Sequence, residues 1–329
     1  MKTLVFAATG IAMLAMSAAE AETLKVSSFL PPNHVWNHAI EAWGEEINAL
    51  SNGEFDVEIF PAGQLGPPPR QFDLVRSGGA DIAVILHSAT PGRFPMTELA
   101  GLPLTHPSSG DSSAITSRRL TELAPDYLAA EHPDTRILWM AVTPPLKVHM
   151  SNTDLSDISA MKGKRIRYAG ATWQSIIQTL GGSPVPVPPA EAADAMSKGV
   201  VDGACFPFEA TKSFDLAPVT KYSLEPGLAA APFALVMSQA RYDGLSPELQ
   251  SIIDETTGPD RAEWFGKMLD EGENAGRQYL VDGGVTMVSL SEDQISGLKS
   301  DFAPIVDAAV ASAGKTSAAA ADFLTAYTE

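Results

Sequence analysis

Hydrophobic and polar positions follow two periods along the first ninety or so residues, and these periods predict strands and helices in turn. From Asn37 onward, Ile40, Trp43 and Ile47 recur at the three- to four-residue spacing of one helix face. Residues 55–60 alternate between apolar and polar side chains, which is typical of a half-buried strand. With a strand at 24–29, a helix carrying Phe72 and Val75, and an apolar strand at 80–86, the predicted order is strand, helix, strand, helix, strand.

The same order returns in the second half of the chain. The predicted strands and helices are 165–168, 172–180, 183–187, 189–198 and a strand that begins at 200. Both units end alike, with Ser-Gly-Gly-Ala-Asp-Ile-Ala at 77–83 and Ser-Lys-Gly-Val-Val-Asp-Gly-Ala at 197–204. Alternating strands and helices of this length predict an α/β protein with two open, mainly parallel sheets flanked by helices. Because such sheets bind ligands at the carboxyl ends of their strands, we expect a ligand cleft between two lobes.

Further elements follow the second unit, and they suggest that the lobes interleave. Residues 234–237 predict a strand, 247–256 and about 260–280 predict helices, and the Ala-rich stretch 292–328 also has a helical pattern. No low-complexity linker separates two halves. We therefore expect residues 22–145 plus 231–272 to form lobe 1, and residues 146–230 plus 273–329, with the C-terminal helices, to form lobe 2.

The first 21 residues have the composition of a secretory signal peptide. Lys2 supplies a positive charge, the stretch from Leu4 to Met16 is apolar or small, and Ala19-Glu20-Ala21 fits the cleavage rule. The alternative is a membrane anchor, which needs roughly 20 apolar residues. We expect cleavage after about Ala21 and a periplasmic mature protein.

Charge and composition remove several classes of function. The chain has 40 acidic and 22 basic residues and a net charge of −18, which argues against a nucleic-acid partner. There is no Gly-x-Gly-x-x-Gly motif, and no cofactor or metal ion is predicted. The lone Cys205, between Ala204 and Phe206, fits a buried thiol better than a nucleophile.

One arginine stands out in this acidic chain. The run Lys162-Gly163-Lys164-Arg165-Ile166-Arg167 is basic, and its last residue falls at the carboxyl end of a predicted strand, just before a helix that begins near Thr172. A guanidinium at that place can bind both oxygens of a carboxylate, and the helix end favours negative charge. The alternative is a surface ion pair with one of the many acids.

Three segments resemble the solute-binding proteins of TRAP transporters, the DctP type. They are Phe60-Pro61-Ala62-Gly63-Gln64-Leu65-Gly66, Met161-Lys162-Gly163-Lys164-Arg165-Ile166-Arg167 and Gly199-Val200-Val201-Asp202-Gly203. The resemblance implies a two-lobed periplasmic receptor that captures an organic-acid anion and delivers it to membrane-embedded permease subunits. It also implies that Arg167 clamps the ligand carboxylate, because members of the family place an arginine at the end of this run.

Two departures from the family pattern bear on the ligand. Lys147 stands where many members carry a second arginine, and lysine keeps the charge but loses the planar fork. Phe206 stands where many carry an asparagine, so an aromatic surface replaces a polar contact. We therefore favour a monocarboxylate with an aromatic or apolar body, of the benzoate type, over a C4-dicarboxylate, a 2-oxo acid or a sugar acid.

Other candidate ligand contacts come from position alone. Asn33 and His34 follow the first strand, His87 and Ser88 follow the third strand, and Trp173 lies in the helix after Arg167. Glu209 could accept a ligand hydroxyl, but a carboxylate would repel a bound anion unless it were protonated. The rival class is an exported enzyme on the same scaffold, although the sequence offers no recognisable set of nucleophile, base and orienting group. A third alternative is a ligand-binding sensor that docks on a signalling receptor and has the same cleft.

Overall fold

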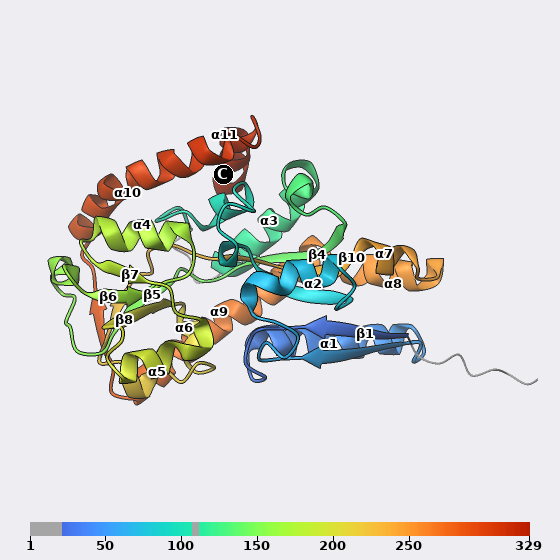
Figure 1. Ribbon diagram of the computed structural model, residues 1–329, viewed down its shortest axis with the longest axis horizontal. Helices are drawn as coiled ribbons and strands as arrows, with labels where there is room; N and C mark the ends of the chain where they lie inside the picture. Colours follow the sequence, from blue (N-terminus) through green and yellow to red (C-terminus); the bar gives the residue numbers. More distant parts are fainter. Residues whose placement is uncertain (1–21, 107–111) are drawn as a thin grey trace, which may run out of the picture.

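The computed structural model describes residues 22–106 and 112–329, so the predicted signal peptide lies outside the described residues. Each half of the fold is built on its own sheet with helices around it (Figure 1). Lobe 1 contains the five-stranded sheet, and lobe 2 contains the six-stranded sheet. The first passage through lobe 1 comprises β1 (Glu22–Ser27), α1 (Val35–Leu50), β2 (Phe55–Phe60), α2 (Gln71–Arg76), β3 (Ile82–Leu86), α3 (Ser112–Tyr127) and β4 (Thr135–Val142).

The chain then crosses to lobe 2 and comes back. Lobe 2 comprises β5 (Lys147–Met150), β6 (Arg165–Arg167), α4 (Ala171–Thr179), β7 (Ser183–Val185), α5 (Ala192–Ser197), β8 (Gly203–Phe206), α6 (Phe208–Thr211) and β9 (Tyr222–Glu225). The return adds β10 (Pro232–Ser238), α7 (Gln239–Asp243), α8 (Pro247–Thr256) and α9 (Pro259–Asp282). The last elements are β11 (Thr286–Ser289), α10 (Glu292–Ala313) and α11 (Ala320–Thr328). None of the helices in the described ranges is long and apolar enough to cross a membrane.

The repeat predicted from the sequence is confirmed in the sheet order. Lobe 1 has the order β2-β1-β3-β10-β4, and lobe 2 contains the run β8-β6-β7 within β11-β9-β5-β8-β6-β7. In both lobes the first strand of the unit lies in the middle, with parallel neighbours on each side. The remaining strands make the sheets mixed, since β10 is antiparallel to β3 and β4, and β5 is antiparallel to β8 and β9.

Helix α1 shows how the apolar pattern builds lobe 1. His34 caps it by accepting a hydrogen bond from the Trp36 N–H, and the buried face carries Ile40, Trp43 and Ile47 as predicted. The ring of Trp36 lies 4.3 Å from that of Phe265 in α9, centroid to centroid. The loop that follows β1 is therefore anchored at one end by the sheet and at the other by a capped, buried helix.

Two extended chain crossings and helix α9 join the lobes ahead of the C-terminal helices. The crossings, residues 143–146 and 226–231, run antiparallel and hydrogen-bond to each other, from Leu146 N to Ala229 O at 2.8 Å and from Thr143 N to Ala231 O at 3.1 Å. Helix α9 packs on α3 in lobe 1 and on α6 in lobe 2, as its long diagonal path in Figure 1 suggests. The predicted boundaries at 145/146 and 230/231 fall within these crossings, although the division into lobes remains an interpretation.

The C-terminal helices depart from the predicted division. Helix α10 runs along α4 of lobe 2, but α11 packs against α3 of lobe 1 (Figure 1). Phe323 and Tyr327 of α11 are buried in the same apolar cluster as Leu120 of α3. The chain thus crosses between the lobes again, because the buried face of α11 packs in lobe 1.

Candidate ligand-binding site

A small cavity of about 50 Å³ lies between the lobes, at the carboxyl ends of β1, β3, β6 and β8. Lobe 1 lines it with Phe29, Leu30, His34, Leu86 and Phe233. Lobe 2 lines it with Arg167, Cys205, Phe206, Glu209 and Phe214. The crossing segments contribute Thr143, Leu146 and Ala231, so any change in the angle between the lobes would alter the cavity.

Arg167 is the cation of this cavity. The residue is only 3% exposed, and its guanidinium donates from Nε to Val187 O at 3.0 Å and from Nη1 to Cys205 O at 3.1 Å. Burial lowers the pKa of Arg167 to about 10, which leaves it charged at neutral pH. Throughout the described residues no carboxylate pairs with it. A buried charge with carbonyl contacts alone is energetically unfavourable, so the geometry suits an anionic ligand as its partner.

Aromatic rings flank the guanidinium. The Arg167 Cζ atom lies 4.4 Å from the centroid of the Phe206 ring, in a cation–π contact, and Phe206 packs on Phe214 at 5.2 Å between centroids. On the lobe 1 side, Phe29 and Phe233 are stacked, with centroids 6.3 Å apart and planes 16° apart. Two aromatic pairs from opposite lobes therefore line the cavity and favour a flat or apolar ligand body.

His34 and Glu209 add polar groups to an otherwise apolar lining. The side chains of both residues are nearly inaccessible, at 3% and 4% exposed, and His34 Nε2 lies 3.7 Å from Glu209 Oε2. Burial, with a contribution from Glu273, raises the pKa of Glu209 to about 8, and burial lowers the pKa of His34 to about 3. Both groups are therefore neutral at pH 7, which leaves Arg167 as the charge that lines the cavity.

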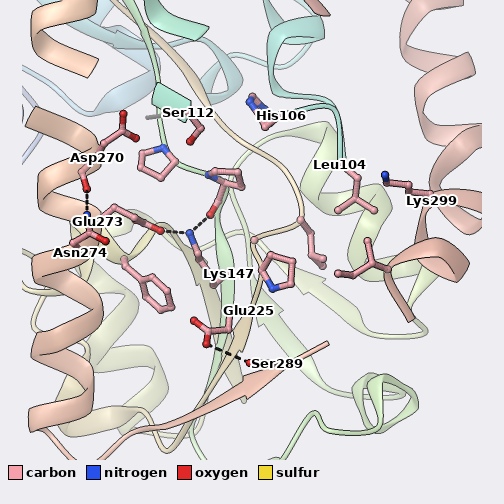
Figure 2. Close-up of a pocket in the computed structure, with 17 residues that line it drawn as sticks. Leu104, His106, Ser112, Lys147, Glu225, Asp270, Glu273, Asn274, Ser289 and Lys299 are labelled. Carbon is pink, nitrogen blue, oxygen red and sulfur yellow. Dashed lines mark hydrogen bonds and ion pairs between the residues drawn. The ribbon is translucent and has the colours of Figure 1, made fainter. Parts of the chain in front are cut away.

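Lys147 lies elsewhere, in a second and larger cavity of about 580 Å³. Figure 2 shows its ammonium directed at Glu273 of α9, with which it forms an ion pair, and at the carbonyl of Pro145. Glu225 and Asp270 also line this cavity, as does Lys299, so the acids outnumber the cations in its wall. The structure thus brings Lys147 together with Glu273 rather than with Arg167.

The remaining candidates from the sequence lie outside the cavity lining. Asn33 is exposed. His87 directly follows β3 and is buried, and its Nε2 atom lies 3.0 Å from the Nε2 atom of His132. Ser88 and Trp173 line a neighbouring crevice beside Gly170. Cys205 does line the cavity, but its thiol is buried, and burial raises its pKa, which is the opposite of what a nucleophile needs.

Two aromatic residues of the lining were not identified from the sequence. Phe233 lies near the start of β10, and an antiparallel strand brings its amino end to the edge where the parallel strands finish. Phe214 follows the short helix α6 and packs on Phe206. The signal that could have found Phe233 is the predicted strand at 234–237, but its direction in the sheet is a property of the tertiary fold.

Two lobes that share one strand-helix-strand-helix-strand unit, with a buried cation in the cavity between them, define a ligand-binding protein of the two-lobed type. The chain belongs to the bacterial extracellular solute-binding proteins, family 7 (DctP), whose family model matches residues 26–313. A solute-binding protein of Roseobacter denitrificans is 23% identical over 92% of this chain and 95% of its own length.

Solved structures of TRAP solute-binding proteins share the fold. One from a marine metagenome, specific for aromatic acid ligands and in complex with metahydroxyphenylacetate, is 32% identical with a TM-score of 0.88, covering 94% of this chain and 98% of its own. One from Rhodoferax ferrireducens, in complex with copurified benzoate, is 28% identical with a TM-score of 0.88, covering 94% and 97%. The resemblance found in the sequence motifs is confirmed.

Proposed function

We propose that this protein is the periplasmic receptor of a TRAP-type transporter and that it captures a small aromatic monocarboxylate. The observation that carries the proposal is the guanidinium of Arg167, buried without an acidic partner among the described residues and flanked by aromatic rings. The carboxylate of the ligand would pair with Arg167, and its ring would lie among Phe29, Phe206 and Phe233. No bond is made or broken in this function.

The charge of the cavity favours one carboxylate over two. Arg167 is positive, while His34 and Glu209 are neutral at pH 7. A C4-dicarboxylate would bury a second negative charge without a partner, which is strongly unfavourable. A sugar acid would bury several hydroxyls, and each unpaired one costs about 1–3 kcal/mol. Benzoate and the aromatic-acid ligand bound by the two relatives described above support the same class.

Capture would proceed by closure of the lobes. The crossings at 143–146 and 226–231 are the segments that can absorb a rotation, and bound ligand would shift the population toward the closed form. Export through the predicted signal peptide and delivery to membrane-embedded permease subunits complete the proposal, and both follow from the family.

A ligand screen tests the proposed class directly. We expect benzoate and its close analogues to raise the melting temperature, whereas succinate, pyruvate and galacturonate leave it unchanged. A ligand at one hundred times its Kd stabilises the folded protein by about 2.7 kcal/mol, so a thermal-shift assay detects it. Stabilisation by dicarboxylates or sugar acids alone would show that the aromatic assignment is wrong.

Closure itself can be tested at Gly170. This residue precedes α4 with φ of +85°, and a Cβ atom there would lie 2.4 Å from the Cβ of Ser88 in lobe 1. Gly170→Ala should hold the lobes apart and weaken benzoate binding about tenfold or more, since 1.4 kcal/mol is a factor of ten. We expect the loss in a faster dissociation rate, measured by stopped-flow fluorescence.

The matched control for this closure test is Gly163→Ala. Gly163 has a similar φ of +75°, but no atom lies within 4 Å of an added Cβ. Gly163→Ala therefore also places an alanine at a positive φ, but without touching the other lobe. Equal losses of affinity in the two variants would show that strain, and not closure, is responsible.

A further inference from the structure

We propose that His34 and Glu209 form a second polar subsite that binds a hydroxyl group on the ring of the ligand. The inference rests on the proposed function and narrows its ligand to an aromatic monocarboxylate hydroxylated away from the carboxylate. It starts from an unusual pair: two buried polar side chains that line the cavity and face each other across 3.7 Å, too far for a hydrogen bond.

The Glu209 carboxyl group and the Nε2 atom of His34 make no hydrogen bond within the described part of the chain. Among the described residues, the carboxyl group of Glu209 makes no hydrogen bond; only its backbone N–H does, donating to Glu273 Oε2 at 3.0 Å. His34 accepts from the Trp36 N–H through Nδ1 at 3.3 Å, so in the neutral ring the proton resides on Nε2, the atom that faces Glu209. A hydroxyl between them could accept from His34 Nε2 and donate to Glu209.

The charges around His34 and Glu209 favour a neutral ligand group, such as a hydroxyl, at this subsite. Glu273 of α9 lies beside Glu209 and is itself paired with Lys147 of β5, while Arg167 lines the same cavity without forming an ion pair with Glu209. Burial and Glu273 raise the pKa of Glu209, and Lys147 lowers it by less. The protonated carboxyl does not repel the bound anion, and it offers both a donor and an acceptor.

The position of the pair fixes which hydroxyl it can reach. The ring of His34 packs edge-on against Phe214, at 6.0 Å between centroids, and Phe214 packs in turn on Phe206, over which the guanidinium of Arg167 lies. A chain of contacts through Phe214 and Phe206 thus links the imidazole to the guanidinium. A hydroxyl in the ortho position would stay beside the carboxylate at Arg167, whereas a meta or para hydroxyl would point toward His34 and Glu209.

Calorimetry with four ligands tests the subsite: benzoate and its 2-, 3- and 4-hydroxy derivatives. We expect the wild-type protein to bind the 3- or 4-hydroxy isomer at least about tenfold more tightly than benzoate, because an unmade hydrogen bond leaves buried groups unpaired. The 2-hydroxy isomer should gain no such preference. The readout is the ratio of Kd values within one protein, which does not depend on effects that a substitution has on all ligands alike.

Two substitutions should remove the preference by different routes. Glu209→Met replaces the carboxyl with an apolar group of similar length, and the ratio should fall to within about twofold of one. His34→Asn keeps a side chain that caps α1 but withdraws the imidazole, so it tests the subsite even if Glu209→Met does not fold. Glu209→Gln has both a donor and an acceptor at this position and should recover the preference. Glu248→Met, on the exposed surface of α8, is the control for a Glu→Met substitution.

The outcomes separate the subsite from the proposed function. If all four ligands bind the wild-type protein within about threefold of each other, or if the preference survives in both Glu209→Met and His34→Asn, the subsite is wrong and the aromatic-acid function stands. If no aromatic acid binds while a dicarboxylate or sugar acid does, the proposed function fails and the subsite fails with it. A preference lost in both variants and recovered in Glu209→Gln supports the subsite.

Discussion

Arg167→Ala should strongly weaken the binding of benzoate while leaving the protein folded. Removing one partner of a buried, hydrogen-bonded ion pair costs about 2–5 kcal/mol, because the other charge stays buried without a partner. That range corresponds to a loss of about 30- to 4,000-fold in affinity. Isothermal titration calorimetry measures the loss directly, and circular dichroism reports whether the fold is intact.

The fold should survive because Arg167 has no acidic partner that its removal would orphan. The substitution frees only the carbonyl groups of Val187 and Cys205, and it relieves the burial of a charge that the ligand-free protein does not neutralise. The two effects oppose each other in the free energy of unfolding. We therefore expect the melting temperature without ligand to change little, and the ligand-induced shift to disappear.

Arg165→Ala is the matched control. It removes an arginine from the same strand, two residues earlier, where the side chain is exposed and paired with Asp202 at 2.8 Å. An exposed pair of this kind contributes about 0–1 kcal/mol to stability, and the residue does not line the cavity. Affinity for benzoate should be unchanged. Binding retained within a few-fold in Arg167→Ala would sink the assignment of Arg167 as the carboxylate clamp.

The sequence predicted the features that depend on local patterns. The two strand-helix-strand-helix-strand units follow from apolar periodicity, and the sheets repeat the same order of strands in both lobes. Arg167 could be placed at the end of its strand because a basic run led directly to a helix start. Its burial and its lack of an acidic partner could not be predicted, since these depend on every element packed around it.

The features that the sequence did not predict depend on contacts between distant segments. Lys147 meets Glu273, which lies 126 residues away in the chain, and this ion pair turns the ammonium toward the second cavity. Phe233 reaches the candidate site only because β10 inserts antiparallel into the sheet of lobe 1. In each case the sequence contains the residue, but it does not show which distant residues lie beside it in the fold.

The net negative charge of the chain bears on how an anionic ligand would reach the cavity. A net charge of −18 disfavours the approach of an anion, so the cavity must supply its own attraction. Under the proposed function, Arg167 would supply this attraction, and the neutral forms of His34 and Glu209 would not cancel it. We infer that a single cation among aromatic rings selects the charge of the ligand, while the rings select its body.

The largest effect on stability is expected from Gly276→Ala. Gly276 lies in α9 where the helix crosses α6, and an added Cβ would lie 1.8 Å from the carbonyl oxygen of Phe208 and 2.4 Å from its carbonyl carbon. Both contacts are with backbone atoms, so no side chain can move aside, and α6 would have to separate from α9. That separation would also displace Glu209, because this residue directly follows Phe208 in the chain.

We expect Gly276→Ala to destabilise the protein by about 3 kcal/mol or more, which lowers the melting temperature of a chain of this length by about 5 °C or more. Gly297→Ala in α10 makes the same substitution in a helix where nothing lies within 4 Å of the new Cβ. It should raise the melting temperature slightly, because alanine is favoured over glycine in a helix by about 1 kcal/mol. Circular dichroism should therefore show shifts of opposite sign in the melting temperatures of the two variants. This difference reports the effect of the close approach of α9 to α6. A melting temperature of Gly276→Ala equal to that of the wild type would mean that this approach does not hold the lobe 2 wall of the cavity in place.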